Sequence, residues 1–217
     1  MKVGTDSVLL GAIIPQIEEV STILDIGAGS GILALMLAQR FSNASIDAIE
    51  IDFAAATQAH YNFEQSSWGN RLKVYHKGLQ AFSATKKYQL IVSNPPYFVL
   101  EDAYQMEDSS RRDARYTHTL THHELLRNSM NLMDEKGTLF VILPSSNAAS
   151  FIHLAQGFGL NQTFEVAIKM KPNALVSRYI LGFSLTPKMM EQSEFVVYDA
   201  LGKRSKAYAL VTSDFYL

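Results

Sequence analysis

Apolar residues follow two alternating patterns along most of the chain. Over residues 5–19 and 32–41 they recur at three- and four-residue spacing, which predicts helices with a buried face. Short apolar runs such as residues 22–26 and 90–93 lie between these stretches and are typical of buried strands. Helices are predicted at 5–19, 32–41, 53–65, 124–133 and 148–158, and strands at 22–26, 45–51, 72–76, 90–93, 137–143, 163–170 and 178–185.

This alternation predicts an α/β fold, in which a mostly parallel seven-stranded sheet is covered by helices on both faces and ends in an antiparallel C-terminal hairpin. No internal repeat or linker-like stretch interrupts the pattern. Residues 1–217 are therefore expected to form a single domain, with an N-terminal helical segment at 1–20 and a C-terminal elaboration at 186–217. Ligands of such sheets bind at the carboxyl ends of strands, where the strand order reverses.

Charge and composition narrow the possible partners. Nineteen Lys and Arg residues against 21 Asp and Glu give a net charge of −2, so no global positive field would draw the chain to nucleic acid, and any such contact must be local. The absence of cysteine excludes disulfides, thiolate metal sites and a cysteine nucleophile. No apolar run reaches the ~20 residues that span a bilayer, and Asp6 interrupts the apolar start, so we expect a cytoplasmic protein that does not enter a membrane.

A glycine-rich turn follows the first predicted strand. Its sequence places Asp25, Gly27, Gly29 and Gly31 in the order D-x-G-x-G-x-G, where glycines allow a ligand close to the backbone at a helix N-terminus. A dinucleotide fingerprint would need a third glycine where Ile32 stands, which argues against an oxidoreductase. The turn instead resembles motif I of Rossmann-like class I methyltransferases, which use S-adenosylmethionine.

A second motif, N-P-P-Y-F, follows the strand at 90–93. An exocyclic amine conjugated to a ring is a weak nucleophile, so a site that methylates it must accept hydrogen bonds from its two hydrogens. The side-chain oxygen of Asn94 and the carbonyl of Pro95 can serve as these acceptors, and the ring of Tyr97 can stack on a planar base. The neighbouring Pro96 and Phe98 are candidate substrate contacts. The motif therefore indicates a preorganised pocket rather than general-base chemistry.

Together, the two motifs resemble those of amino-methyltransferases that act on adenine N6 or glutamine N5. Residues 1–12 match the M-K-x-G-T-D-x-x-L-L-G-A segment of the bacterial tRNA1(Val) adenine-N6 methyltransferase family, and further matches extend over essentially the whole chain. The resemblance implies methylation of adenine 37 of a valine tRNA, with S-adenosylmethionine as the cofactor. The target base must be extruded or lie in a loop, because stacking hides N6.

The resemblance also implies a role for each matched residue. Glu50, at the end of the second strand, would hold the ribose hydroxyls of the cofactor, and Ile51 follows it. The turn after the third strand lacks the acid that many class I enzymes use for the adenine amino group, so main-chain contacts at Gly78 or Leu79 would replace it. The predicted cofactor-binding residues are Thr5, Asp6, Asp25, Gly27, Gly29, Gly31, Glu50, Ile51, Gly78, Leu79 and Asn94, and the predicted catalytic residues are Asn94, Pro95 and Tyr97.

Several alternatives stay open from the sequence. A glutamine-N5 methyltransferase of a translation release factor and a ribosomal RNA guanine-N2 enzyme share the chemistry, and an inactive cofactor-binding partner subunit is the non-enzymatic alternative. Arg111, Arg112 and Arg115 could bind tRNA phosphates or lie in a solvated loop. His122 and His123 lack a third ligand at suitable spacing, so no metal is expected. We expect a monomer or a weak homodimer.

Overall fold

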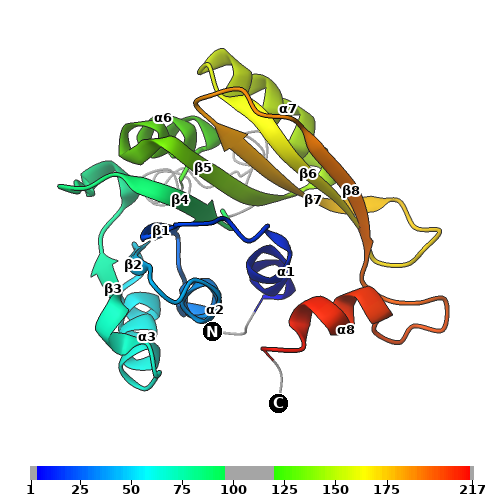
Figure 1. Cartoon of the computed structure of the whole chain (residues 1–217), viewed down its shortest axis with the longest axis horizontal. Helices are drawn as coiled ribbons and strands as arrows, with labels where there is room; N and C mark the ends of the chain where they lie inside the picture. Colours follow the sequence, from blue (N-terminus) through cyan, green and yellow to red (C-terminus); the bar gives the residue numbers. More distant parts are fainter. Residues whose placement is uncertain (1–3, 96–119, 216–217) are drawn as a thin grey trace, which may run out of the picture.

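A computed structural model describes residues 4–95 and 120–215. They form a single eight-stranded sheet with helices on both faces (Figure 1). The strands are β1 (Thr22–Ile26), β2 (Ser45–Glu50), β3 (Leu72–His76), β4 (Tyr88–Ser93), β5 (Met133–Pro144), β6 (Asn161–Lys169), β7 (Val176–Ser184) and β8 (Glu191–Val196). The helices are α1 (Thr5–Ile13), α2 (Ile32–Arg40), α3 (Phe53–Glu64), α6 (His122–Leu132), α7 (Ser145–Gly157) and α8 (Lys206–Thr212), with short 3₁₀ turns η1 (Gly69–Arg71) and η2 (Leu79–Ala81).

The strand order is β3-β2-β1-β4-β5-β7-β6-β8. The first three strands are laid down outward from β1, after which the chain returns to place β4 on the other side of β1. Strands β3, β2, β1, β4 and β5 pair in parallel, whereas β7 is antiparallel to both β5 and β6. The order therefore reverses between β1 and β4, which is where sheets of this type bind ligands.

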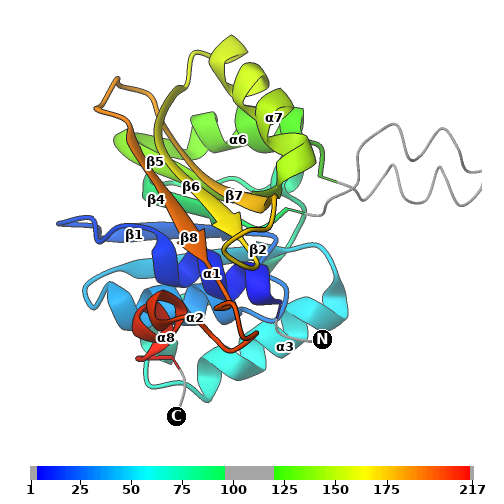
Figure 2. The same ribbon diagram turned by 90° about the vertical axis from the view of Figure 1, so that its right-hand side faces the viewer.

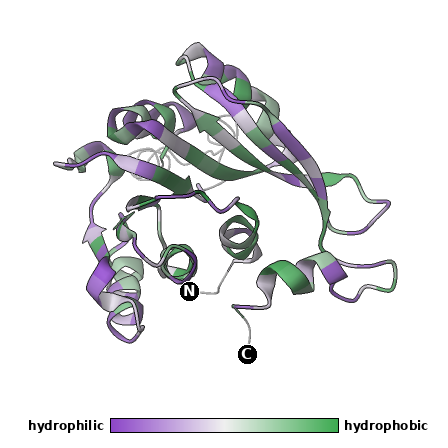
Figure 3. Cartoon of the chain, in the orientation of Figure 1, coloured by the Kyte–Doolittle hydropathy of each residue, from purple (hydrophilic) through white to green (hydrophobic). Residues whose placement is uncertain are grey.

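The central strands are buried on both faces, as a parallel sheet requires. One apolar cluster lies between the sheet and α1, α2, α3 and α8, and a second lies between the sheet and α6 and α7. Both views show the two groups of helices on opposite sides of the sheet (Figures 1 and 2). Successive residues of β4 alternate between the clusters, with Leu90 and Val92 in the first and Ile91 in the second. Apolar colouring follows β4 and β5 through the centre of the molecule (Figure 3).

The predicted fold class is confirmed, and all seven predicted strands are present. An eighth strand, β8, comes from the segment that was expected only as an elaboration. Its first four residues are polar and exposed at the sheet edge, so they gave no apolar signal, and Phe195 is buried near its end. The first helix was predicted to reach residue 19, which is wrong: it ends at Ile13 because Ile14 precedes Pro15, and the residue before a proline disfavours helical backbone.

Within the described ranges, no helix combines the length and apolar character needed to cross a membrane.

Arg71 fixes the position of α2 from the turn that precedes β3. Its guanidinium donates to the carbonyls of Phe41 (3.1 Å) and Ala44 (2.6 Å) through Nη1 and of Ala38 (2.7 Å) through Nη2. These are carbonyls at the helix end and just beyond it, where partners within the helix are missing. The planar guanidinium satisfies three acceptors at once, which a lysine ammonium on a flexible stem cannot do in the same geometry.

We expect Arg71→Lys to lower the free energy of unfolding by about 2 kcal/mol, because hydrogen bonds from a charged donor to partly buried carbonyls are lost. Urea denaturation followed by circular dichroism measures this change. The matched control is Arg127→Lys on the exposed side of α6, which should stay within about 0.5 kcal/mol of the parent protein. Equal effects of the two substitutions would contradict the assigned role of Arg71.

Candidate active site

Three strand ends lie in one row at the point where the strand order reverses. In the pairing register, Ile26 of β1 lies opposite both Ile49 of β2 and Ser93 of β4. The Ser93 hydroxyl also donates to the Ile26 carbonyl, with 2.9 Å between the oxygens. The next residues along the chain are Gly27, Glu50 and Asn94, so the register brings the glycine turn, the acid of β2 and the first residue of the second motif together at the carboxyl ends of the strands.

The glycine turn is held against β2 by its own backbone. The amides of Gly27 and Ala28 donate to the carbonyl of Ile49, at 2.9 and 3.1 Å. Gly31 has a φ of +81°, and a Cβ there would lie 2.5 Å from the ring of Phe63 in α3, so only glycine fits. Gly27 is different: it is exposed, and a Cβ would meet nothing within 4 Å. The turn is therefore packed from behind and open above Gly27.

Asp25 supports this turn from within the core. Its side chain is 1% exposed, and its Oδ2 accepts a hydrogen bond from the Ala34 amide in the first turn of α2, at 3.1 Å. Burial raises the pKa of the Asp25 carboxyl to about 7. The hydrogen bond from Ala34 lowers this pKa, and the nearby charge of Glu50 raises it further. Asp25 thus contacts the start of α2 rather than the open side of the turn.

Glu50 joins the end of β2 to the turn. Its Oε2 accepts from the Gly29 amide at 2.7 Å, and its Oε1 accepts from the Asp52 amide at 2.9 Å. A carboxylate offers about four acceptor positions, so this half-buried group can also take ligand hydroxyls. The Asp52 side chain in turn caps α3 by accepting from the Ala55 amide at 2.8 Å.

Apolar side chains beside Glu50 are unusually exposed. Ile51 is 43% exposed and Phe53 is 69% exposed, and the Phe53 ring meets the His76 ring edge-on at a centroid distance of 5.3 Å. A Cβ on Gly78, just after β3, would lie 3.2 Å from Cδ1 of Ile51. Gly78 and Ile51 are therefore neighbours, and Leu79 is buried behind them. Together they present a small apolar surface next to an acid, which suits a nucleoside.

Asn94 meets the first turn of α1. Its Nδ2 donates to the hydroxyl oxygen of Ser7 at 3.0 Å, and the adjacent Pro95 is buried. Asp6 precedes Ser7 and accepts from Nε of Arg178 in β7 at 3.1 Å. Thr5, the first residue of α1, is exposed.

The predicted residues between 4 and 95 thus gather at one edge of the sheet. The sequence did not indicate the contact of Ser7 with Asn94 or that of Arg178 with Asp6. Ser7 occupies a variable position of the matched N-terminal segment, and Arg178 lies 172 residues from Asp6, so neither gave a local signal. The predicted catalytic residue Tyr97 and the predicted substrate-binding residues Pro96, Phe98, Arg111, Arg112 and Arg115 lie outside the described residues.

His122 and His123 in α6 contact aromatic rings. The His122 ring meets Phe151 at a centroid distance of 5.0 Å, and the His123 ring meets Phe158 at 4.9 Å. Burial lowers the pKa of His122. Among residues 4–95 and 120–215, no three His, Asp or Glu side chains come together as a metal site would require.

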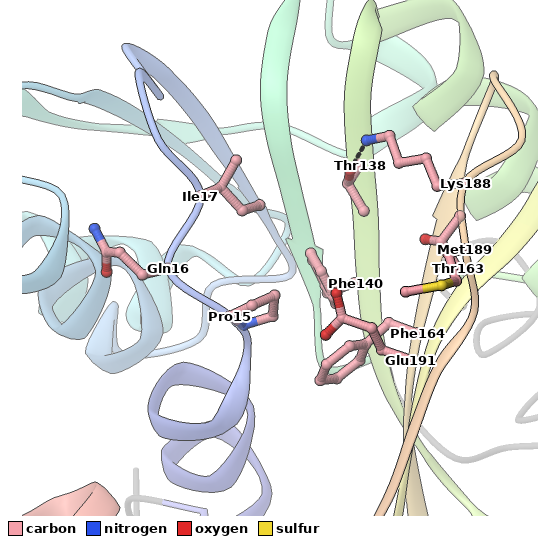
Figure 4. A pocket seen from close by; sticks show the side chains of 10 residues that line it. All are labelled: Pro15, Gln16, Ile17, Thr138, Phe140, Thr163, Phe164, Lys188, Met189 and Glu191. Atoms are coloured by element: carbon pink, nitrogen blue, oxygen red, sulfur yellow. Dashed lines mark hydrogen bonds between the residues drawn. The ribbon is translucent and has the colours of Figure 1, made fainter.

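A cavity of about 230 Å³ lies towards the opposite ends of the strands, away from the glycine turn (Figure 4). It opens between the loop that leads into β1, near Ile17, and the amino-terminal halves of β5 and β6, near Thr138 and Phe164. Lys188 crosses its rim and donates to the Thr138 hydroxyl at 3.4 Å. The amino ends of the strands lie here, so the cavity is separate from the glycine turn and Asn94.

Comparison with known proteins assigns a family to this arrangement. The family model described as "Methyltransferase small domain" matches residues 2–171. The chain is similar to a tRNA1(Val) (adenine(37)-N6)-methyltransferase from Edwardsiella ictaluri, with 41% identity over 219 residues that cover all of this chain and 87% of the relative. It is also similar to an enzyme of the same name from Bacteroides fragilis, with 40% identity over 220 residues that cover all of this chain and 91% of the relative.

A solved structure supports the fold independently. The crystal structure of a predicted O-methyltransferase from Agrobacterium tumefaciens superposes with a TM-score of 0.75, covering 96% of this chain and 95% of that one. Its sequence is only 16% identical, so the likeness concerns the fold alone.

The buried Asp25 carboxyl predicts a pH-dependent stability. The folded protein keeps the Asp25 proton up to a pH of about 7, whereas the unfolded chain releases it near 3.8, so the folded state binds more protons between these values. Stability from this group is therefore complete below pH 3.8 and is lost as the pH rises towards 7. We expect wild-type stability to fall relative to Asp25→Asn over this window, by up to about 1.4 kcal/mol for each pH unit.

Urea denaturation of both proteins at pH 5, 6, 7 and 8 measures the difference. The gap should change between pH 5 and 7 and level off above 7. A difference that stays constant from pH 5 to 8 would contradict the raised pKa.

Proposed function

The chain belongs to the tRNA1(Val) (adenine(37)-N6)-methyltransferase family, and on this premise we propose that it methylates N6 of adenine 37 in a valine tRNA. The methyl donor of the family is S-adenosylmethionine. The observation that supports this reaction most directly is the position of Asn94, one residue beyond β4 and level with the glycine turn of β1. This arrangement would place a hydrogen-bond acceptor for the target amine beside the cofactor site.

The residues present fit this cofactor. The turn is open above Gly27, Glu50 retains acceptor positions beyond its two amide contacts, and Ile51 and Gly78 offer apolar surface next to it. When bound, S-adenosylmethionine would supply the methyl group of its positively charged sulfur: a nitrogen–carbon bond would form as the carbon–sulfur bond breaks, leaving S-adenosylhomocysteine and releasing one proton of the amine. We propose that Glu50 takes the ribose hydroxyls, that Ile51, Gly78 and Leu79 line the adenine, and that the following residues line the methionine end: Thr5, Asp6, Gly27, Gly29, Gly31 and Asn94.

Asp25 has a different proposed part. Because its carboxyl is buried on the Ala34 amide, it would contribute to cofactor binding by holding the turn and α2 together. In this proposal Asp25 maintains the shape of the cofactor site, and Glu50 makes the direct polar contact with the cofactor.

Asn94 and Pro95 would hold the target amine. The N6 lone pair is delocalised into the adenine ring, and acceptors on both N6 hydrogens favour the geometry in which that lone pair points at the methyl group. The Asn94 side-chain oxygen and the Pro95 carbonyl are proposed as these acceptors. Tyr97, with Pro96 and Phe98, is proposed to hold the adenine ring, and Arg111, Arg112 and Arg115 to contact phosphates.

We also propose that residues 1–217 form one domain that acts in the cytoplasm as a monomer or a weak homodimer. The single continuous sheet of the described residues supports the first of these proposals.

The function is tested by methyl transfer from labelled S-adenosylmethionine to an unmodified valine tRNA transcript, with a translation release factor as a parallel substrate. Digested nucleosides identified by mass spectrometry should contain N6-methyladenosine, and a transcript with guanine in place of adenine 37 should gain none. In the same assay Asn94→Ala should lose at least about a hundredfold in turnover, because a preorganised acceptor in the transition state is gone.

The affinity of Asn94→Ala for the cofactor should stay nearly unchanged, because Asn94 is one of several residues proposed at the methionine end and its main proposed task is to hold the amine. Label on the release factor would replace the proposal with glutamine methylation. Cofactor binding without transfer to either substrate would favour a partner subunit.

Glu50→Ala should weaken binding of S-adenosylhomocysteine by at least about tenfold, because charge-assisted hydrogen bonds to ribose hydroxyls are lost. Isothermal titration calorimetry gives the affinity, and a thermal melt confirms that the variant is folded. The matched control is Glu64→Ala at the exposed end of α3, where the glutamate only pairs with His60 at 3.3 Å. Equal affinities of the Glu50 and Glu64 variants would disprove the ribose contact.

A further inference from the structure

We infer that Ser7 is a positioning residue that sets the orientation of the Asn94 amide for catalysis. This inference rests on the proposed function of Asn94 and deepens it, since it names the side chain through which Asn94 is oriented. The motif that identifies Asn94 does not contain Ser7, which is 87 residues away in the chain.

An asparagine amide has two ends of nearly equal size and opposite hydrogen-bonding character. The NH₂ end donates and the oxygen end accepts, so rotation of the amide by half a turn exchanges an acceptor for a donor. An amine that offers two hydrogens needs the oxygen end. If the NH₂ end of Asn94 faced the substrate, two donors would oppose each other. The protein therefore needs a contact that distinguishes the two ends.

Ser7 supplies that contact on the α1 side of Asn94. The Ser7 hydroxyl oxygen accepts from Nδ2 of Asn94 at 3.0 Å, so the NH₂ end is turned towards α1. The oxygen end is consequently turned away from Ser7. Both residues are only partly buried, which places the pair at the surface of the site rather than in the core.

Each side of this hydrogen bond is attached to a fixed element. Asn94 follows Ser93, which is fully buried and bonded to β1 through the Ile26 carbonyl. Ser7 lies between Asp6, which is paired with Arg178 of β7, and Val8, which is buried in the core. A hydrogen bond between two fixed elements restricts the rotation of the amide as well as its place, which is what a positioned acceptor requires.

The arrangement predicts a specific kinetic effect. Removal of the Ser7 hydroxyl leaves Asn94 in place but removes the contact that turns its NH₂ end towards α1, so a smaller fraction of enzyme is competent. We expect Ser7→Ala to lower kcat by about five- to tenfold, the loss typical of one neutral hydrogen bond. The KM for tRNA and the affinity for S-adenosylhomocysteine should stay nearly unchanged, because the Ser7 hydroxyl is bonded to Asn94 and is not among the proposed cofactor contacts.

The first experiment compares four variants with wild type and with Asn94→Ala in the methyl-transfer assay, and the first variant is Ser7→Ala. Ser7→Thr keeps a hydroxyl and should restore most of the turnover that Ser7→Ala loses. Ser150→Ala is the matched control, because that exposed hydroxyl only donates to the Asn147 carbonyl within α7, and it should behave as wild type. The fourth protein, Ser7→Ala combined with Asn94→Ala, should be no slower than Asn94→Ala alone, since Ser7 acts through Asn94.

Three results would overturn the inference. They are an unchanged kcat in Ser7→Ala, an equal fractional loss in the Asn94→Ala background, and a loss of turnover that comes with weaker S-adenosylhomocysteine binding. The last two would indicate a general structural role of the α1 turn.

A second measurement does not depend on tRNA. The two side-chain NH₂ protons of Asn94 can be identified in a ¹H–¹⁵N spectrum by their absence in Asn94→Ala. In Ser7→Ala, but not in Ser150→Ala, their signals should shift and exchange faster with water. Failure of wild type to methylate tRNA would reject the proposed function, and the same spectrum would still decide the orientation: an unchanged Asn94 signal in Ser7→Ala rejects the role of Ser7, and a changed one supports it.

Discussion

The in-register pairing of β2, β1 and β4 is the constraint on which the rest of the site depends. Because Ile49, Ile26 and Ser93 lie in one row, the residues that follow them leave the sheet at the same height. The glycine turn, Glu50 and Asn94 are then neighbours without any further adjustment. A shift of one residue in either pairing would turn every side chain of that strand to the opposite face and separate the three groups.

Two hydrogen bonds convert this alignment into a rigid frame. The Gly29 amide binds the Glu50 carboxylate across the β1–β2 pair, and the Ser93 hydroxyl binds the Ile26 carbonyl across the β1–β4 pair. Asp25 supports the turn from the core at a cost in free energy. A carboxyl that is 1% exposed must either keep its proton or be desolvated as a charge. Its contact with the Ala34 amide offsets part of that cost and joins the turn to α2.

The sequence was sufficient for features that depend on local chemistry. Gly31 needs a left-handed backbone, Glu50 ends a strand next to a glycine turn, and Asn94 precedes a proline, and each of these leaves a recognisable local pattern. The family resemblance extended this to the reaction. The strand β8 was missed because a polar edge strand has almost no regular spacing of apolar residues. The end of α1 was predicted six residues too late, although Pro15 marks it.

Contacts between residues far apart in the sequence could not be predicted from the sequence pattern. The pairing of Asp6 with Arg178 and that of Ser7 with Asn94 join elements that meet only after the sheet has formed. A serine in a first helical turn or an arginine in a strand satisfies no rule that would reveal its partner. Such residues are identified by distance and direction in the folded chain.

These contacts support the site from two directions. The glycine turn is held by Glu50 and by the packing of Gly31 on α3, whereas Asn94 is held from α1, which is itself tied to β7 through Arg178. The two directions meet at the proposed methionine end of the cofactor, which Thr5, Asp6 and Asn94 share with the glycine turn. Side chains that share no partner respond to substitution almost independently, so a change at Glu50 should act mainly on cofactor affinity and a change at the Ser7–Asn94 contact mainly on how the target amine is held.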